Sequence, residues 1–156
     1  MRRRRVASDP PAAAVVASDL RRPSRPAEDC LKALLVLEEG DQVVPPRRLA
    51  ARLGLTGAAV TWILQRLSES GLAEYTRSRG ARLTEAGRRT AQGIVRRHRI
   101  LERFLVDVVG VPAHEVHEEA ERLEHVASEE LIAAMATLLG QPEHDPHGAP
   151  IPALAS

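Results

Sequence analysis

The sequence has few aromatic residues, one cysteine and no long apolar run. Aromatic residues make up 2% of its 156 residues, so the core has to be built from Leu, Val, Ile and Ala, which favours helices over a β-sandwich. Cys30 has no partner for an internal disulfide, which favours a reducing compartment. No apolar run approaches the ~20 residues that cross a bilayer, and Ala12 to Ala17 is too short for a signal-peptide core. We therefore expect a mostly α, cytoplasmic protein.

Sequence motifs of catalysis are missing as well. There is no HExxH motif, no nucleophile motif and no glycine-rich phosphate loop. Pairs of histidine and glutamate can bind a catalytic zinc ion or perform acid–base chemistry, but without such a motif we expect that the chain is not an enzyme.

Charge is unevenly distributed, although the net charge is only +1. Seven arginines lie within the first 25 residues, whereas His114 to Glu130 is acidic. This asymmetry fits one face for nucleic acid and another for cations. Residues 1–26, rich in Arg, Pro, Ala and Ser, are predicted to form a disordered basic tail. The tail either contacts DNA phosphates or has no essential role.

Apolar spacing and turn residues predict the order of the elements. Thr56, Thr84 and Ser128 are expected N-caps. The predicted helices cover 27–39, 45–53, 57–70, 84–109, 113–127 and 128–139, and the predicted strands cover 72–75 and 81–83. The expected domains are a winged-helix DNA-binding domain over 27–90, a helical dimerisation and metal-binding domain over 91–140, and an irregular tail over 141–156.

A helix-turn-helix is predicted within the first of these domains. Ala50 lets two short helices approach, and Gly54 makes the turn between them. Val60 and Leu64 then bury the inner face of the second helix. A basic hairpin follows, which completes the order of a winged helix.

The second of these helices is expected to enter the major groove of DNA. Trp62 either contacts DNA or packs at the helix surface. The predicted base contacts are Thr56, Ala58, Ala59, Thr61, Trp62 and Gln65, and the predicted phosphate contacts are Arg47, Arg48, Arg66, Arg77, Arg79 and Arg82. The alternative is that these arginines form an ordinary solvated surface.

A polar stripe borders the apolar seams of the last helices. Glu102 follows His98 by four residues, so both side chains can face one point. His117, Glu121 and Glu124 follow at spacings of four and three, with His125 next to them. Carboxylates and imidazoles at a core boundary need a partner, and a divalent cation suits them. The alternative is a solvated glutamate face with histidines satisfied in the core.

Several segments together resemble the diphtheria-toxin-repressor family of metal-dependent transcriptional regulators, and in particular its manganese-responsive branch. The resemblance covers about residues 27–152. The segments are Glu28 to Ala33, Gly80 to Thr84, Arg97 to Leu105, Val116 to Ala120, Leu123 to His125 and Pro146 to Pro152.

This resemblance implies a homodimeric, metal-activated repressor that binds a palindromic operator in double-stranded DNA. The implied primary metal ligands are Asp29, His98, Glu121, Glu124 and His125. A second metal site is implied at Glu102, His117, Asp145 and His147, with His98 shared in the iron branch. Relatives that respond to iron usually carry methionine and cysteine where Asp29 and Glu121 stand, and hard oxygen ligands favour Mn²⁺. Fe²⁺ is the alternative, and Zn²⁺ or other divalent ions can occupy such a site in vitro.

The chain also departs from the family's pattern. Lys32 replaces a glutamate that some manganese regulators use, which argues against a two-manganese cluster. Cys30 replaces a common tyrosine, and Asp145 replaces a common cysteine. The alanines 58 and 59 and Trp62 predict a different operator sequence. The chain stops before the SH3-like domain that many relatives add.

The predicted switch follows from the origin of the ligands. Asp29 comes from the DNA-binding half and the others come from the second half, so an ion fixes the two halves and the spacing of the recognition helices. Leu131, Ile132, Met135 and Leu139 either form the dimer surface with the long helix or close the monomer core.

Two other functions remain open. One is a winged-helix regulator that senses an organic ligand, or an oxidant through Cys30. The other is a metal-buffering or scaffolding protein without a DNA role.

Overall fold

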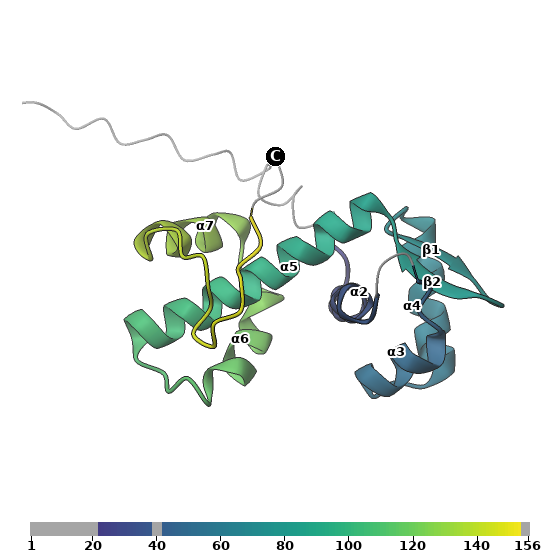
Figure 1. Ribbon diagram of the computed structural model, residues 1–156, viewed down its shortest axis with the longest axis horizontal. Helices are drawn as coiled ribbons and strands as arrows, with labels where there is room; N and C mark the ends of the chain where they lie inside the picture. Colours follow the sequence, from purple (N-terminus) through teal and green to yellow (C-terminus); the bar gives the residue numbers. More distant parts are fainter. Residues whose placement is uncertain (1–21, 39–41, 154–156) are drawn as a thin grey trace, which may run out of the picture.

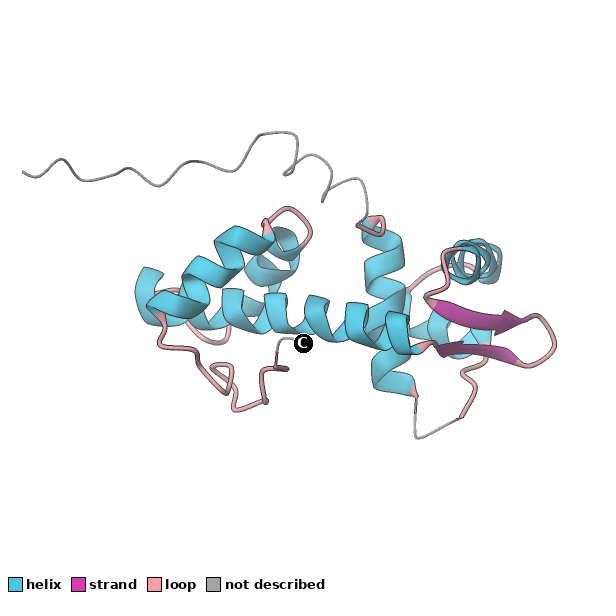
Figure 2. Ribbon diagram, turned by 90° about the horizontal axis from the view of Figure 1, so that it is seen from above, coloured by secondary structure: helices cyan, strands magenta, loops and turns pink. Residues whose placement is uncertain are grey.

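The computed structural model describes residues 22–38 and 42–153 and has a mostly helical fold (Figures 1 and 2). The N-terminal half of the described chain contains α2 (Arg25–Leu37), α3 (Pro46–Leu53), α4 (Gly57–Glu69), β1 (Ala73–Thr76) and β2 (Gly80–Leu83). The rest contains α5 (Glu85–Phe104), the π-helical turn η1 (Leu105–Val109), α6 (Val116–Glu124) and α7 (Glu129–Leu138). The fold class predicted from the sequence is confirmed.

The three predicted N-caps are all formed. The hydroxyl oxygen of Thr56 accepts a hydrogen bond from the backbone N–H of Ala59, and Thr84 does the same for Gly87. Ser128 caps α7 by accepting from Leu131. Each bond satisfies one of the unpaired N–H groups of a first helical turn.

Several predicted ends differ from the structure. Arg25 and Pro26, which were predicted to belong to the disordered tail, form the start of α2, because proline is compatible with a first helical turn. Residues 1–21 of that predicted tail lie outside the described residues, as do residues 39–41, where the first helix was expected to end. The long helix is α-helical only to Phe104 and continues as η1. The helix predicted over 113–127 is confined to α6.

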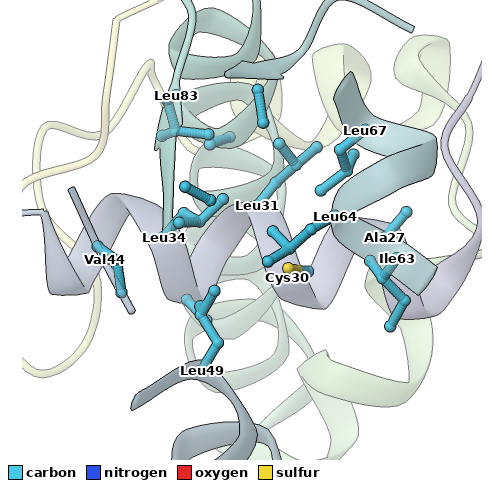
Figure 3. Packing of buried hydrophobic residues seen from close by; sticks show 14 of the residues in the cluster. Ala27, Cys30, Leu31, Leu34, Val44, Leu49, Ile63, Leu64, Leu67 and Leu83 are labelled. Carbon is cyan, nitrogen blue, oxygen red and sulfur yellow. The ribbon is translucent and has the colours of Figure 1, made fainter. Parts of the chain in front are cut away.

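The N-terminal half packs α2, α3, α4 and the antiparallel β1–β2 hairpin around one apolar core. Figure 3 shows Leu31 and Leu34 of α2 in this core, with Leu64 of α4 and Leu83 of β2 around them. A short bridge between Val44 and Ala81 adds a third segment to the hairpin. This is the predicted winged-helix arrangement.

Gly87 fixes the start of α5 against the hairpin. A Cβ atom built at this position would lie 1.8 Å from the carbonyl oxygen of Leu72. Only glycine therefore allows the first turn of α5 to approach the chain that enters β1.

A second apolar core lies at the other end of α5. It gathers Ile100 and Leu101 of α5, Val116 and Ala120 of α6, and Ile132 of α7. Ile132 is buried, so it closes the monomer core, and Met135 and Leu139 pack against the same core. Leu131 is exposed. Figure 1 shows α5 crossing from the hairpin to α6 and α7, so this helix belongs to both halves.

The segment 141–153 has neither a helix nor a strand, yet it is packed. Ile151 is buried in the second core, and an isolated bridge joins His144 and Pro150. Within the described residues, no helix is both long and apolar enough to cross a membrane.

Candidate metal centre

Asp29, Glu121, Glu124 and His125 converge between the two halves. Asp29 comes from α2, and the others come from the end of α6. One ligand atom from each of the four lies within 4.8 Å of the ligand atoms of the others. His98 of α5 joins them, since its Nδ1 atom lies 2.8 Å from Oε2 of Glu124 and 4.0 Å from Oε1 of Glu121. We call these five residues the interdomain cluster.

His125 has one ring nitrogen free to bind an ion. Its Nδ1 atom lies 2.7 Å from Oε2 of Glu28, so this nitrogen donates to the carboxylate. Its Nε2 atom is buried and has no hydrogen-bond partner among the residues that the structure describes. That nitrogen lies 3.3 Å from Oδ1 of Asp29 and 3.4 Å from Oε1 of Glu124. An imidazole oriented by a carboxylate, with its second nitrogen facing more carboxylates, fits a metal ligand.

Glu28 is held in place by arginines. Its side chain is 3% exposed, and its Oε1 atom lies 3.5 Å from both Arg97 and Arg22. Arg97 also donates to the backbone oxygen of Glu124 and to Glu129. The sequence analysis did not assign these roles to Glu28 and Arg97. A sequence feature that could have indicated a role for Glu28 is its position three residues before Leu31, within the buried stripe of α2.

Lys32 lies beside the interdomain cluster and bonds two of its members. Its Nζ atom donates to Oε1 of Glu121 at 2.8 Å and to Oε1 of Glu124 at 2.6 Å. Burial lowers the pKa of this ammonium, but the hydrogen bonds with Glu121 and Glu124 outweigh burial and raise the pKa above its ordinary value. For the carboxyl group of Asp29, burial raises the pKa and outweighs the attraction of His125 and Lys32. The carboxylates of the interdomain cluster therefore already have a cation bound to them.

His98 links the interdomain cluster to a second group. Its Nε2 atom lies 3.0 Å from Oε1 of Glu102 and 3.1 Å from Nδ1 of His117. Burial lowers the pKa of His98, but hydrogen bonds with Glu102 and Glu124 outweigh it and raise the pKa to about 9. Burial alone would raise the pKa of Glu102, but its bonds with His98 and His117 lower it overall.

The remaining residues of the predicted second site meet at Glu102. Ligand atoms of Glu102, Asp145 and His147 lie within 4.8 Å of one another. Nε2 of His147 donates to the backbone oxygen of Ala113, which directs its Nδ1 atom to within 3.9 Å of Oε2 of Glu102. Asp145 accepts from the backbone N–H groups of His147 and Ala149 and lies 3.5 Å from Arg99.

A cleft gives access to the interdomain cluster. It has a volume of about 630 Å³, and its lining includes Asp29, Lys32, His98, His117 and Glu121. An ion can therefore reach the carboxylates without unfolding of either half.

The predicted DNA-binding residues lie on α3, on α4 with its N-cap, and on the hairpin. Arg47 and Arg48 of α3 are exposed, as are Arg77 and Arg79 of the hairpin. Thr56, Ala58 and Gln65 are exposed along α4 and its cap, whereas Ala59 and Thr61 are half-buried.

Two of the predicted phosphate contacts, Arg82 and Arg66, have partners within the protein. Arg82 pairs with Glu74 across the hairpin through both Nε and Nη2. Arg66 lies 5.9 Å from the ring of Trp62 and 3.4 Å from Glu69. Trp62 is 60% exposed and lines a hollow with Pro23, so it lies beside the start of α2.

Comparisons with known proteins extend these observations. Residues 24–81 match the family model described as "Iron dependent repressor, N-terminal DNA binding domain". Residues 84–153 match "Iron dependent repressor, metal binding and dimerisation domain".

Two curated relatives illustrate the similarity. The chain is 42% identical over 125 residues to the iron-dependent repressor IdeR of Mycobacterium tuberculosis, covering 80% of this chain and 54% of that protein. It is 38% identical over 126 residues to the diphtheria toxin repressor of Corynebacterium efficiens, with the same coverage of 80% and 54%. The chain therefore spans about half the length of these relatives.

A solved structure described as a manganese-dependent transcriptional repressor in complex with manganese is also similar. The TM-score is 0.73 at 42% identity, and the match covers 82% of this chain and 59% of that one.

Proposed function

Because the chain belongs to the iron-dependent repressor family, which includes the diphtheria toxin repressor, we propose that it is a metal-dependent transcriptional repressor that controls metal homeostasis. One observation carries the proposal. Asp29 of the winged-helix half lies within 4.8 Å of ligand atoms from Glu121, Glu124 and His125 of the second half. A ligand set drawn from both halves couples ion binding to the position of the DNA-binding elements.

The residues that would hold the ion are those of the interdomain cluster: Asp29, His98, Glu121, Glu124 and His125. A divalent ion supplies the positive charge that ties carboxylates of α2 and α6 together. Because Asp29 belongs to α2, an ion bound to it would restrain the position of this helix. The buried Leu31 and Leu34 of α2 pack in the same core as α4. Glu28 keeps His125 in the orientation that directs its second nitrogen at Asp29.

We assign manganese as the activating ion. Asp29, Glu121 and Glu124 contribute carboxylate oxygens, and the cluster contains no sulfur ligand among the described residues, which suits a hard ion such as Mn²⁺. Fe²⁺ is the second candidate, because relatives described as iron-dependent and as manganese-dependent are about equally similar to this chain.

A second ion site is part of the proposal. Glu102 faces His117 on one side and His147 on the other, with Asp145 close by. The tautomer of His147 that donates to Ala113 leaves its Nδ1 atom as a ligand.

We further propose a cytoplasmic homodimer that binds a palindromic operator. The match to a dimerisation domain supports this assembly, and so do the exposed apolar residues Val108, Val109, Leu131 and Leu138 in that half. In such a dimer, the two α4 helices would enter major grooves one helical turn apart, or a multiple of it.

The test measures DNA binding by Asp29→Ala as Mn²⁺ is titrated, with fluorescence anisotropy as the readout. Loss of the only ligand from α2 should abolish the response or require at least about tenfold more Mn²⁺, since each lost charged interaction contributes over 1 kcal/mol. Glu118→Ala, which removes an exposed carboxylate of α6, is the matched control and should behave as wild type. If Asp29→Ala responds at wild-type Mn²⁺ concentrations, the coupling between the halves does not depend on this site.

A further inference from the structure

Lys32 is the single lysine among the 22 basic residues of the sequence. All the other basic residues are arginines. This one lysine is only 19% exposed in its side chain, and its ammonium bonds two of the proposed metal ligands, Glu121 and Glu124. A role for Lys32 should therefore be sought in its interaction with these two carboxylates.

We propose that Lys32 is a tethered cation that competes with the metal for Glu121 and Glu124, so that it raises the ion concentration needed for binding. This inference rests on the proposed function and adds the residue that sets its threshold. The competition follows from which oxygens are engaged.

Both carboxylate oxygens of Glu124 are engaged by other side chains. Lys32 holds its Oε1 atom at 2.6 Å, and His98 holds its Oε2 atom at 2.8 Å. Lys32 also holds Oε1 of Glu121. A divalent ion that binds the same oxygens would lie close to the ammonium, and the repulsion between the two cations favours displacement of the ammonium.

Lys32 has space to move when it is replaced. It lines the same cleft as Asp29 and Glu121, and its four-carbon stem can turn while the ammonium stays in water. The backbone of α2 keeps the charge nearby, so the competitor remains at a high local concentration.

The first test uses isothermal titration calorimetry with Mn²⁺. All proteins carry His117→Ala, which removes one proposed ligand of the second site. Lys32→Met should bind Mn²⁺ about tenfold more tightly than the parent, since the charged hydrogen bonds of the ammonium with Glu121 and Glu124 no longer have to be broken.

The matched control is Arg89→Met. This change removes an exposed ion pair with Glu85 on α5 and should leave the affinity unchanged. If Lys32→Met binds Mn²⁺ with the parent's affinity or more weakly, Lys32 is a structural ion pair and the competition is wrong.

A second measurement needs no substitution and so does not depend on the folding of a variant. With one lysine in the chain, protein labelled with ¹⁵N at lysine Nζ gives a single side-chain ammonium signal. Saturation with the diamagnetic ion Zn²⁺ should move this signal to the position of a solvated lysine. If Zn²⁺ binds and the signal stays in place, the competition is wrong and the proposed function stands. If neither Mn²⁺ nor Zn²⁺ binds the wild-type protein, the proposed function and this inference both fail.

Discussion

Glu28 illustrates how a single buried carboxylate can fix the orientation of a candidate metal ligand, His125, with which it shares a hydrogen bond. It accepts from Nδ1 of His125 and is itself fixed by Arg97 and Arg22. Its role depends on contacts between residues 69 and 97 positions apart in the chain. Local spacing cannot reveal such contacts, and Asp29 itself was indicated only by the resemblance to the family.

Glu28→Gln should weaken Mn²⁺ binding about tenfold, as changes in the groups that orient a metal-bound histidine usually do. The amide still accepts from His125 but carries no charge. Glu38→Gln is the control, because Glu38 is equally buried but pairs with Arg88 and the backbone of Leu83. Calorimetry should show weaker binding only for Glu28→Gln, although both variants lose stability. Equal Mn²⁺ affinity in the two variants would remove Glu28 from the site.

His98 predicts a pH dependence of stability in the presence of chelator. Its pKa is raised from 6.5 to about 9 in the folded protein, so the charged imidazole stabilises the folded state. This contribution is fully present below pH 6.5 and is lost as the pH rises through about 9. The pKa values of Glu102 and Glu124 are lowered from 4.5, so the stability that these carboxylates contribute changes only below pH 4.5 and stays constant between pH 6.5 and 9.

The free energy of unfolding by urea should therefore decrease between pH 6.5 and 9, and His98→Gln should flatten the decrease. Mn²⁺ affinity should rise over the same range, because an imidazole has to lose its proton before it binds a metal. A wild-type stability that stays constant or increases over this range would contradict the assigned environment of His98.

At the scale of elements, the starts of helices were the most predictable feature. Thr56, Thr84 and Ser128 act within three residues of their own position, so the sequence contains the whole interaction. Helix ends depend on tertiary packing. The apolar spacing continues beyond Phe104, but the hydrogen bonding changes to that of η1, and nothing in the spacing distinguishes the two.

The candidate ligands of α5 and α6 were also predictable at this scale, because they repeat at helical spacing, whereas Asp29, Asp145 and His147 were implied only by the resemblance to the family. The contact of the Lys32 ammonium with these ligands was not predictable. The sequence showed that a lysine stands three residues after Asp29, but its bonds with Glu121 and Glu124 cross 89 and 92 residues of chain. Only the packing of α2 against α5 and α6 brings them together.

The contact between α5 and the hairpin gives a test of how the long helix is fixed. Gly87→Ala should destabilise the protein by about 1–3 kcal/mol, the usual cost of an added group in a packed site. Gly93→Ala on the same helix meets no atom within 4 Å and should stabilise it by about 0.4–1 kcal/mol. Urea denaturation of both variants provides the measurement. If the two variants have equal stability, α5 is not held by this contact.

At the scale of the whole molecule, α5 is the only element of the described residues that contributes to both cores. Both α2 and α6 pack against it (Figure 1), and side chains of α2 and α6 meet at the interdomain cluster. Arg97 adds a direct tie, since it bonds Glu28 of α2 and the last turn of α6. An ion bound at this point would favour one arrangement of the two halves, and DNA that requires this arrangement should tighten ion binding by the same factor.

The central claim is that metal controls DNA binding. The most direct test is to incubate the purified protein with host genomic DNA and to sequence the recovered fragments, with Mn²⁺, with Fe²⁺ under anaerobic conditions, and with chelator. The account predicts a palindromic site that is enriched with metal and absent with chelator, and that Mn²⁺ is more effective than Fe²⁺. Enrichment of the same site in chelator would show a DNA-binding protein that the interdomain cluster does not switch, and would contradict the account.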